Sequence, residues 1–196
     1  PNDGGVVAAS GLRPVAKAMQ AYCAGRACDF ATLHGDNIYP DGLTLGTDGR
    51  SDADRLRLLL AEPLGPLAAG HDQFRIYAAL GNHDWRTSRG GALAQVAWLE
   101  RTPPFYMKGT HYRVVPPNSG GLVELFVIDT TLLLGTQAVK EVLVTEDGSE
   151  QRLDEVEDNP KGVLPLAPGE ARQAEWLAEA LASSTARWKI VMGHHP

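Results

Sequence analysis

The sequence predicts an α/β protein with two β-sheets, and three observations support this fold class. Short apolar runs are separated by stretches with helical periodicity, which is typical of parallel strand–helix–strand units. Three of the apolar runs end in glycine followed by aspartate, asparagine or histidine. Two further runs, 111–115 and 122–128, flank a turn rich in proline and glycine and predict an antiparallel hairpin. Because such a hairpin fits poorly within a purely parallel series, a second sheet is expected.

The first expected helix is capped by Ser10 and runs to about Cys23, with Pro14 in its first turn. We expect the helix to pack on the sheet through its apolar stripe, which consists of Val15, Met19 and either Tyr22 or Cys23. The strand 30–33 follows it.

Ser51 is expected to cap a second helix over 52–60, and Pro63 and Pro66 are expected to end it. Its inward-facing residues are Leu56, Leu59 and Leu60. The next predicted strand is 75–80. A third helix is expected to begin at Gly90-Gly91 and to end before Pro103-Pro104, with an apolar stripe of Leu93, Val96, Ala97 and Leu99.

The last third of the chain contains an acidic stretch from Gly135 to Pro168 with few large apolar residues in its second half. We expect a solvated, mobile insertion, and a surface loop is favoured over an active-site lid. Helical periodicity returns over 169–182 and leads into a last strand, 189–192. The whole chain, 1–196, is interpreted as one domain carrying this insertion at about 135–168.

Composition limits the possible partners. The chain is 43% hydrophobic and 21% charged, and it has no apolar run long enough to span a bilayer. Its formal net charge of −6 argues against nucleic acid, because phosphate-backbone binding needs a basic surface. An anionic substrate would therefore need a local source of positive charge, which metal ions could supply.

The two cysteines, Cys23 and Cys28, lie close enough in sequence for a local disulfide, but a pair of thiols is equally compatible with the spacing. The chain begins at Pro1 without methionine and ends at Pro196 directly after a motif, which indicates a fragment or a processed chain. The compartment therefore cannot be assigned from a leader.

Polar side chains gather where three predicted strands end. The junctions are Gly35-Asp36-Asn37-Ile38-Tyr39, Gly81-Asn82-His83-Asp84 and Gly193-His194-His195-Pro196. Ligand sites in open α/β sheets lie at the carboxyl ends of the strands, so these side chains are expected to meet. Carboxylate, phenolate, amide and imidazole groups are metal ligands, and the sequence therefore predicts a metal site.

Asp36 is the strongest single candidate, because a carboxylate at a strand end can bind one cation with each oxygen. The alternative is a turn aspartate; Asn37 and Tyr39 beside it, and the two other junctions, favour metal binding. Asn82 offers a neutral carbonyl oxygen to a metal that must stay Lewis acidic. Of two adjacent histidines, only one is expected to reach the metal, and we choose His194.

Three residues are interpreted as catalytic or supporting: His83, Asp84 and His195. His83 could protonate a leaving alkoxide or hold a phosphate oxygen, with Asp84 orienting its imidazole, although a His–Asp pair that stabilises a loop is the plain alternative. His195 is expected to face the substrate or to support the ligands. Other polar residues have weaker claims: His34 faces away, His71 is solvated, His111 starts a strand and Asp129 holds a neighbouring loop.

The three junctions together resemble the calcineurin-like metallophosphoesterase superfamily, and within it the small purple (tartrate-resistant) acid phosphatases. Tyr39, which follows Gly-Asp-Asn, narrows the resemblance to the latter. Supporting matches surround the junctions; they are Pro1-Asn2, Pro103-Pro104-Phe105-Tyr106, Phe126-Val127-Ile128-Asp129-Thr130 and Gln173-x-x-Trp176-Leu177. The resemblance implies a two-sheet α/β/β/α sandwich, apparently truncated at both ends.

The resemblance also implies a role for each matching residue. Asp36 would bridge two metal ions, Tyr39 would bind ferric iron, and Asn82 and His194 would bind a divalent metal, either Fe, Zn or Mn. His83 would lie near the leaving group. Two ligand motifs of the family are absent from these 196 residues: the aspartate of its first strand, expected before Pro1, and its Gly-His-x-His pair, expected after Pro196.

These observations predict a dimetal hydrolase of small phosphate monoesters that uses metal-activated water. A phosphodiesterase or nucleotide pyrophosphatase on the same fold is the alternative within enzymes. A truncated, non-catalytic binding module is the alternative outside them, because ligands are missing. The family suggests a periplasmic or secreted protein, and the oligomeric state cannot be predicted.

Overall fold

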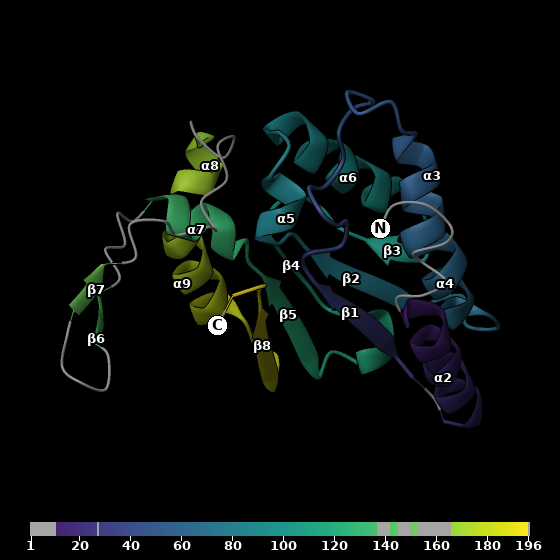
Figure 1. Ribbon diagram of the computed structural model, residues 1–196. Helices are drawn as coiled ribbons and strands as arrows, with labels where there is room; N and C mark the ends of the chain where they lie inside the picture. Colours follow the sequence, from purple (N-terminus) through teal and green to yellow (C-terminus); the bar gives the residue numbers. More distant parts are fainter. Residues whose placement is uncertain (1–10, 27, 137–141, 145–149, 153–165, 196) are drawn as a thin grey trace.

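The computed structural model describes residues 11–26, 28–136, 142–144, 150–152 and 166–195. In this part of the chain the strands form two three-stranded sheets, and a separate antiparallel pair joins β6 (Val142–Val144) to β7 (Glu150–Arg152). Figure 1 shows the two main sheets between two groups of helices. The predicted two-sheet α/β fold is confirmed.

The first sheet is parallel and contains β1 (Phe30–His34), β2 (Arg75–Ala79) and β3 (Phe105–Tyr106), in that order. The predicted strands 30–33 and 75–80 correspond to β1 and β2. Because β1 and β2 run in the same direction and pair His34 with Ala79, the two loops that follow them begin at one edge of the sheet.

The second sheet contains β4 (Tyr112–Val114), β5 (Val123–Val127) and β8 (Trp188–Met192). β4 and β5 are antiparallel, which confirms the predicted hairpin, whereas β8 is parallel to β5. β8 is an edge strand of the described sheet, and Trp188 is 60% exposed. The third polar junction therefore leaves a different sheet from the first two.

The two sheets share one hydrophobic core and two buried polar links. The Tyr112 hydroxyl on β4 donates to the Ala78 carbonyl (2.9 Å) and accepts from the Ala78 backbone N–H (3.1 Å) on β2. The Trp85 indole N–H, after β2, donates to Asp129, after β5, at 2.9 Å. Such buried bonds fix the positions of the sheets, because leaving any of these groups unpaired in the core would cost free energy.

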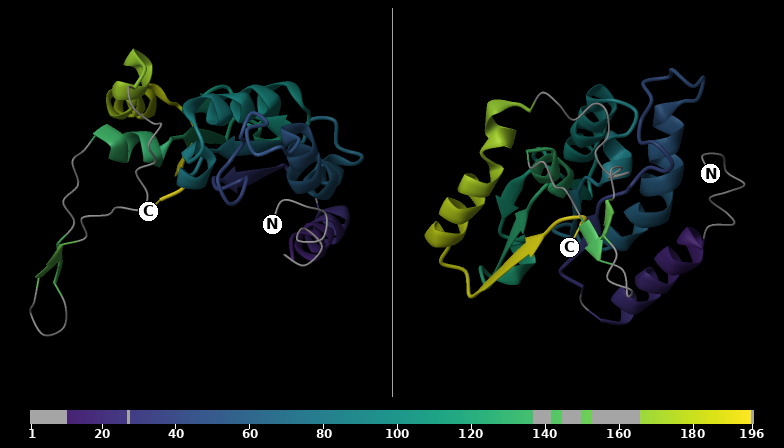
Figure 2. Two further views of the ribbon diagram at one scale, coloured as in Figure 1. Left: turned by 45° about the horizontal axis from the view of Figure 1, so that its top comes forward. Right: turned by 60° about the vertical axis from the view of Figure 1, so that its left-hand side comes forward.

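Helices cover the two sheets on separate sides (Figure 2). α6 (Arg89–Arg101) contacts β3 of the first sheet, and α9 (Gln173–Ser183) contacts β5 of the second. The remaining helices after β2 are short: α5 (Asn82–Trp85), α7 (Thr130–Thr136), α8 (Pro168–Ala171) and the 3-10 turn Pro117–Ser119. The predicted helix 169–182 is thus interrupted, and α8 and α9 meet at Arg172.

The helical segment after Ser51 is longer than predicted. Ser51 caps α3 (Asp52–Leu56) by accepting from the Asp54 N–H, as expected. Four helical pieces then follow one another, the others being the π-helical turn Arg57–Ala61, α4 (Glu62–Leu64) and the 3-10 turn Gly65–Ala68. Pro63 does not end the helix: the backbone is αR at Ala61 and Glu62 before it and at Gly65 after it. Pro63 directly follows the π-helical turn, in which the Glu62 N–H bonds the Arg57 carbonyl, and such a local change of the bonding pattern accommodates a residue without an N–H.

The expected packing of the first helix on the sheet is wrong. α2 (Leu12–Gly25) begins after Gly11, and Ser10 lies outside the described residues. Val15 is 58% and Tyr22 57% exposed, and only Ala16 is buried. α2 packs against α4 and the turn Gly65–Ala68 instead. A cavity of about 530 Å³ lies between the apolar side of α2 and the end of β1.

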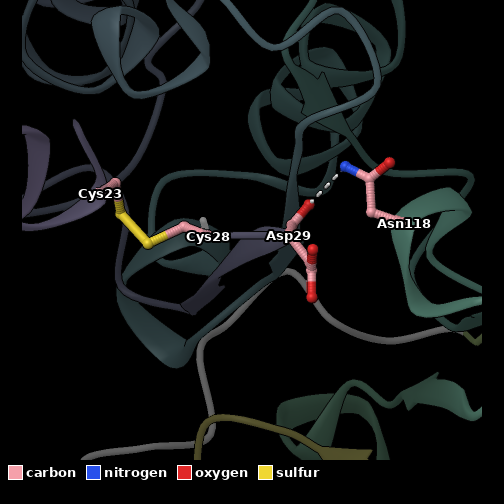
Figure 3. The surroundings of a disulfide bond; sticks show 4 residues. All are labelled: Cys23, Cys28, Asp29 and Asn118. Atoms are coloured by element: carbon pink, nitrogen blue, oxygen red, sulfur yellow. Dashed lines mark hydrogen bonds between the residues drawn. A yellow bond between two sulfur atoms is a disulfide. The ribbon is translucent and has the colours of Figure 1, made fainter. Parts of the chain in front are cut away.

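A disulfide joins α2 to the start of β1. Cys23 and Cys28 are bonded, with their Cα atoms 5.2 Å apart, which resolves the choice that the sequence left open (Figure 3). Next to the bond, the Asn118 amide donates to the Asp29 carbonyl at 3.4 Å. The disulfide therefore anchors a helix that has few buried residues of its own.

Most of the predicted acidic insertion, about 135–168, lies outside the described residues, so its character stays a prediction. Within the described part of the chain, every helix is too short or too polar to cross a membrane.

Candidate metal centre

The loops after β1 and β2 meet backbone to backbone at two glycines. Gly35 has φ +92°, and a Cβ there would lie 2.7 Å from the Gly81 nitrogen. A Cβ on Gly81 would lie 2.3 Å from Asp36 Oδ1 and 2.9 Å from the His194 ring. Only glycine fits such an approach. The glycine in each junction is therefore what allows Asp36 to reach the second loop.

One oxygen of the Asp36 carboxylate, Oδ1, faces His194 and accepts a hydrogen bond from the His83 backbone N–H at 3.1 Å. Asp36 Oδ1 lies 3.2 Å from His194 Nε2, which lies 3.1 Å from Asn82 Oδ1. The other ring nitrogen of His194, Nδ1, is 2.9 Å from the His34 carbonyl oxygen and must carry the hydrogen, because a carbonyl only accepts. In the neutral ring Nε2 then presents its lone pair toward Asp36 and Asn82, as metal-binding histidines do.

The other oxygen faces Tyr39. The Tyr39 hydroxyl donates to Asp36 Oδ2 at 2.5 Å. This hydrogen bond, more than burial, raises the pKa of Tyr39 to about 12. His83 Nε2 lies 3.9 Å from the same oxygen, and its ring centroid is 4.4 Å from that of Tyr39. The two oxygens of the Asp36 carboxylate therefore face different side chains, His194 on one side and Tyr39 with His83 on the other.

The expectation that Asp84 orients the imidazole of His83 is wrong. His83 Nδ1 bonds the Pro40 carbonyl oxygen, so the backbone of the first junction holds the ring. Asp84 is fully buried and accepts from the backbone N–H groups of Asn37 (3.2 Å), Ile38 (3.1 Å) and Gly81 (2.9 Å). A short turn places the Asp84 side chain back over its own loop, out of reach of the His83 ring.

Asp84 instead ties the two loops together. Burial raises the pKa of its carboxyl to about 6, although the backbone N–H groups of Gly81, Asn37 and Ile38 oppose this rise by stabilising the charged form. The Asn37 side chain adds a bond to the Ala79 carbonyl at 2.8 Å. The sequence predicts Asp84 and Asn37 at the centre. In the structure they bond the backbone of the two loops that carry the centre.

His195 contacts the site from the second sheet. Its ring centroid lies 4.7 Å from that of His194, and its Nδ1 is 3.0 Å from the Thr130 hydroxyl. The sequence singled out both histidines but not Thr130, because an isolated threonine carries no distinguishing signal. His34 and His71 are exposed, as expected, and the His34 ring contacts Thr32 rather than the centre.

Asp129 is fully buried and holds a loop, as expected. Its carboxylate accepts from the Trp85 indole (2.9 Å) and from the Leu132 backbone N–H (3.0 Å), and its own backbone is bonded by Gln173. Burial, aided by the neighbouring charge of Asp84, raises the pKa of Asp129 to about 7 even though these bonds lower it.

The buried carboxyl of Asp129 is expected to make stability depend on pH. Its folded-state pKa is above the ordinary value of 3.8, so the folded state binds the proton more tightly than the unfolded state. The stability that the protonated Asp129 carboxyl contributes to the folded state is fully present below about pH 4 and is lost as the pH rises through about 7. Urea unfolding of the chelator-treated protein between pH 4 and pH 8 should show this fall. Asp129→Asn, which cannot ionise, should have a shallower slope, and an unchanged slope would contradict the assignment.

The donor atoms of the centre suit a metal ion, although they are few. Among residues 11–26, 28–136, 142–144, 150–152 and 166–195, no group of three or more His, Cys, Asp or Glu side chains is close enough to hold one. The centre nevertheless brings together a carboxylate, an amide oxygen and an imidazole, from Asp36, Asn82 and His194. This donor set suits one divalent cation, and Tyr39 adds an oxygen on the other side of Asp36.

Comparison with known proteins places the chain in a family. The model of the calcineurin-like phosphoesterase family matches residues 11–196. Purple acid phosphatase 17 of Arabidopsis thaliana is 32% identical over 167 residues, which are 85% of this chain and 42% of that protein. Purple acid phosphatase 3 of the same plant is 29% identical over 167 residues, 85% of this chain and 38% of that protein. The chain thus spans about two fifths of the length of these relatives, and it belongs to the calcineurin-like phosphoesterase family.

Proposed function

We propose that the protein is a dimetal phosphoesterase that hydrolyses small phosphate monoesters, as an acid phosphatase does. The observation that carries the proposal is the position of the Asp36 carboxylate. One of its oxygens faces His194 and the other faces the Tyr39 hydroxyl. A carboxylate so placed can bridge two cations. The relatives named purple acid phosphatases support the same chemistry.

Each predicted ligand has a place in this proposal. Asp36 would hold both metals, Tyr39 would hold iron, and Asn82 and His194 would hold the divalent metal, which would be Fe, Zn or Mn. When bound, the two metals supply Lewis acidity toward the phosphoryl oxygens and lower the pKa of water to generate the nucleophile. His34 supports the divalent site through its carbonyl, which holds the His194 ring in the required tautomer.

Tyr39 must lose its proton before its oxygen can bind iron. In the structure that proton lies in the hydrogen bond to Asp36, which raises the pKa of Tyr39 to about 12. A cation held by Tyr39 would therefore displace this proton and with it the hydrogen bond to Asp36. Asp36 would then have a cation in place of the Tyr39 hydroxyl as its partner.

His83 and His195 act on the substrate. His83 Nδ1 bonds a carbonyl oxygen and so carries hydrogen, which means that Nε2 can donate only when the ring is doubly protonated. As an imidazolium, His83 can give the Nε2 proton to the departing alkoxide or hold a phosphoryl oxygen. His195 is the second imidazole within reach of the phosphate.

The location of the disulfide bears on mechanism and compartment. Cys23 and Cys28 are bonded to each other at the far end of β1, so neither is a nucleophile in this state. Hydrolysis by activated water requires no covalent phosphoenzyme. A disulfide is also typical of an oxidising compartment, which supports a periplasmic or secreted location.

Comparison of a monoester with a diester tests the proposal. The metal-loaded protein should hydrolyse 4-nitrophenyl phosphate with a kcat/KM at least about tenfold above that for bis(4-nitrophenyl) phosphate, a difference of ~1.4 kcal/mol in transition-state binding. A preference for the diester would favour the phosphodiesterase alternative. Retained metal without turnover of either ester would identify a non-catalytic module.

A further inference from the structure

Two of the side chains that meet at the centre come from different sheets. Asn82 follows β2 of the first sheet and His194 follows β8 of the second, yet Asn82 Oδ1 and His194 Nε2 lie 3.1 Å apart. One cation can contact both atoms only while the loops that carry them keep their relative position, because a metal site tolerates only small displacements of its ligands. The bonds that join these two loops therefore bear on metal binding.

The loop after β8 is bonded, on both sides of His194, to one short segment of the second sheet. Before His194, the Met192 carbonyl accepts from the Ile128 backbone N–H at 2.9 Å. After it, the His195 backbone N–H donates to the Thr130 hydroxyl oxygen at 3.0 Å. The backbone of the loop therefore follows the position of residues 128–130.

Asp129 is the middle residue of this segment, and its own bonds fix it in place. Its backbone N–H donates to Gln173 Oε1 at 2.6 Å, and its carbonyl accepts from the Gln173 amide at 3.1 Å. Its carboxylate Oδ1 accepts from the Leu132 backbone N–H at 3.0 Å. Asp129 and Gln173 are both fully buried. The Asp129 carboxylate therefore has a defined position relative to the loop after β8.

The second oxygen of this carboxylate reaches the loop that carries Asn82. Asp129 Oδ2 accepts from the indole N–H of Trp85, which is fully buried, at 2.9 Å. An indole nitrogen only donates, so the direction of this bond is fixed. Asn82 and Trp85 are the first and last residues of α5, which is a single helical turn, so a displaced indole would displace Asn82 as well. One buried bond thus joins the two loops that meet at the centre.

We propose that the Trp85–Asp129 hydrogen bond sets the distance between the two ligands of the divalent metal, and that Asp129 is a positioning residue of the centre. The inference rests on the proposed function for the assignment of Asn82 and His194 as these ligands. Asp129 acts through the peptides on either side of it and through the indole. A weaker bond would leave each ligand intact and would separate the pair.

Three substitutions test the inference. Trp85→Phe removes the indole N–H and keeps an aromatic ring. Asp129→Asn keeps the volume of the side chain but turns an NH2 group toward the N–H of either Trp85 or Leu132. Tyr112→Phe is the matched control, because it removes the other buried bond between the sheets, which joins β4 to Ala78 within β2. Trp85→Phe and Tyr112→Phe should both lower the urea midpoint of the metal-free protein, since each leaves buried polar groups unpaired.

Zinc binding distinguishes a positioning role from a purely structural one. Isothermal titration of the chelator-treated proteins should show a Kd for zinc that is weaker by about tenfold in Trp85→Phe and in Asp129→Asn, as when groups that orient metal ligands are removed. Tyr112→Phe should keep the wild-type Kd although its urea midpoint falls. The visible absorption of bound cobalt(II), which reports coordination geometry, should change in the first two variants and not in Tyr112→Phe.

The outcomes separate this inference from the proposed function. An unchanged Kd for zinc in either Trp85→Phe or Asp129→Asn would overturn the role of the bond, and so would an equal loss of affinity in Tyr112→Phe. A wild type that binds no zinc would overturn the ligand pair and this inference with it. If the zinc affinities follow the expected pattern while the wild type hydrolyses neither ester, the positioning role stands and the proposed catalysis fails.

Discussion

Asp36→Asn is expected to remove the bound metal and the phosphoesterase activity together. An amide has one oxygen and no charge, so it cannot present two anionic donors to two cations. Its NH2 group would also face either the Tyr39 hydroxyl or His194 Nε2, which now contact the two carboxylate oxygens. Without the metals, the transition state would lose several kcal/mol of stabilisation, which corresponds to a fall in kcat/KM of at least about a thousandfold.

The measurement is elemental analysis of metal per chain, made beside the rate with 4-nitrophenyl phosphate. We expect close to one iron and one further metal in the wild type and a large loss of both in Asp36→Asn. Asp41→Asn is a matched control, because Asp41 lies on the same loop, is exposed, and has Arg86 as an ion-pair partner only at 3.9 Å. Asp41→Asn should keep metal and activity, and the same retention in Asp36→Asn would refute the bridging role.

The strands were predictable because their signals are local. β1 and β2 are apolar runs that end in glycine, and β4 and β5 flank a turn with two prolines and two glycines. The apolar runs are short and the turns that bound them have a distinct composition, so both signals are local in the sequence.

The packing of α2 was not predictable, because amphipathicity identifies an apolar side but not its partner. Val15 and Tyr22 have the spacing of a buried stripe, yet both are more than half exposed, and Ala16 is the buried contact. Pro63 shows the same limit: a proline ends most helices, but here a π-helical turn before it lets the helical backbone continue, and the sequence does not reveal that turn.

The members of the site were predictable, and their contacts were not. Glycine before a polar residue at a strand end indicated Asp36, Asn82 and His194, and the structure brings these three together. The interpretation of Asp84 as the partner of His83 assumed that neighbours in sequence are neighbours in space. The backbone instead directs the two side chains to different partners. The His83 ring bonds the Pro40 carbonyl, and the Asp84 carboxylate accepts from three backbone N–H groups.

His83→Ala is expected to keep the metal and to lower the rate by about 10²–10⁴, the usual contribution of a general acid. His83 Nε2 is 3.9 Å from Asp36 Oδ2, within range of the centre, but neither ring nitrogen is needed for the Asp36–Asn82–His194 set. Metal content and activity should therefore separate in this variant, in contrast to Asp36→Asn. His71→Ala, a substitution of an exposed histidine away from the centre, is the control and should change neither.

The dependence on the leaving group decides what His83 does. A nitrophenolate departs without a proton, whereas an alkoxide needs one, so a general acid matters far more for an alkyl phosphate than for 4-nitrophenyl phosphate. If His83 protonates the leaving oxygen, His83→Ala should lose most activity with the alkyl ester. An equal loss with both esters would assign His83 to a phosphoryl oxygen instead. Because Nδ1 already carries a hydrogen that is bonded to the Pro40 carbonyl, either role requires the doubly protonated ring.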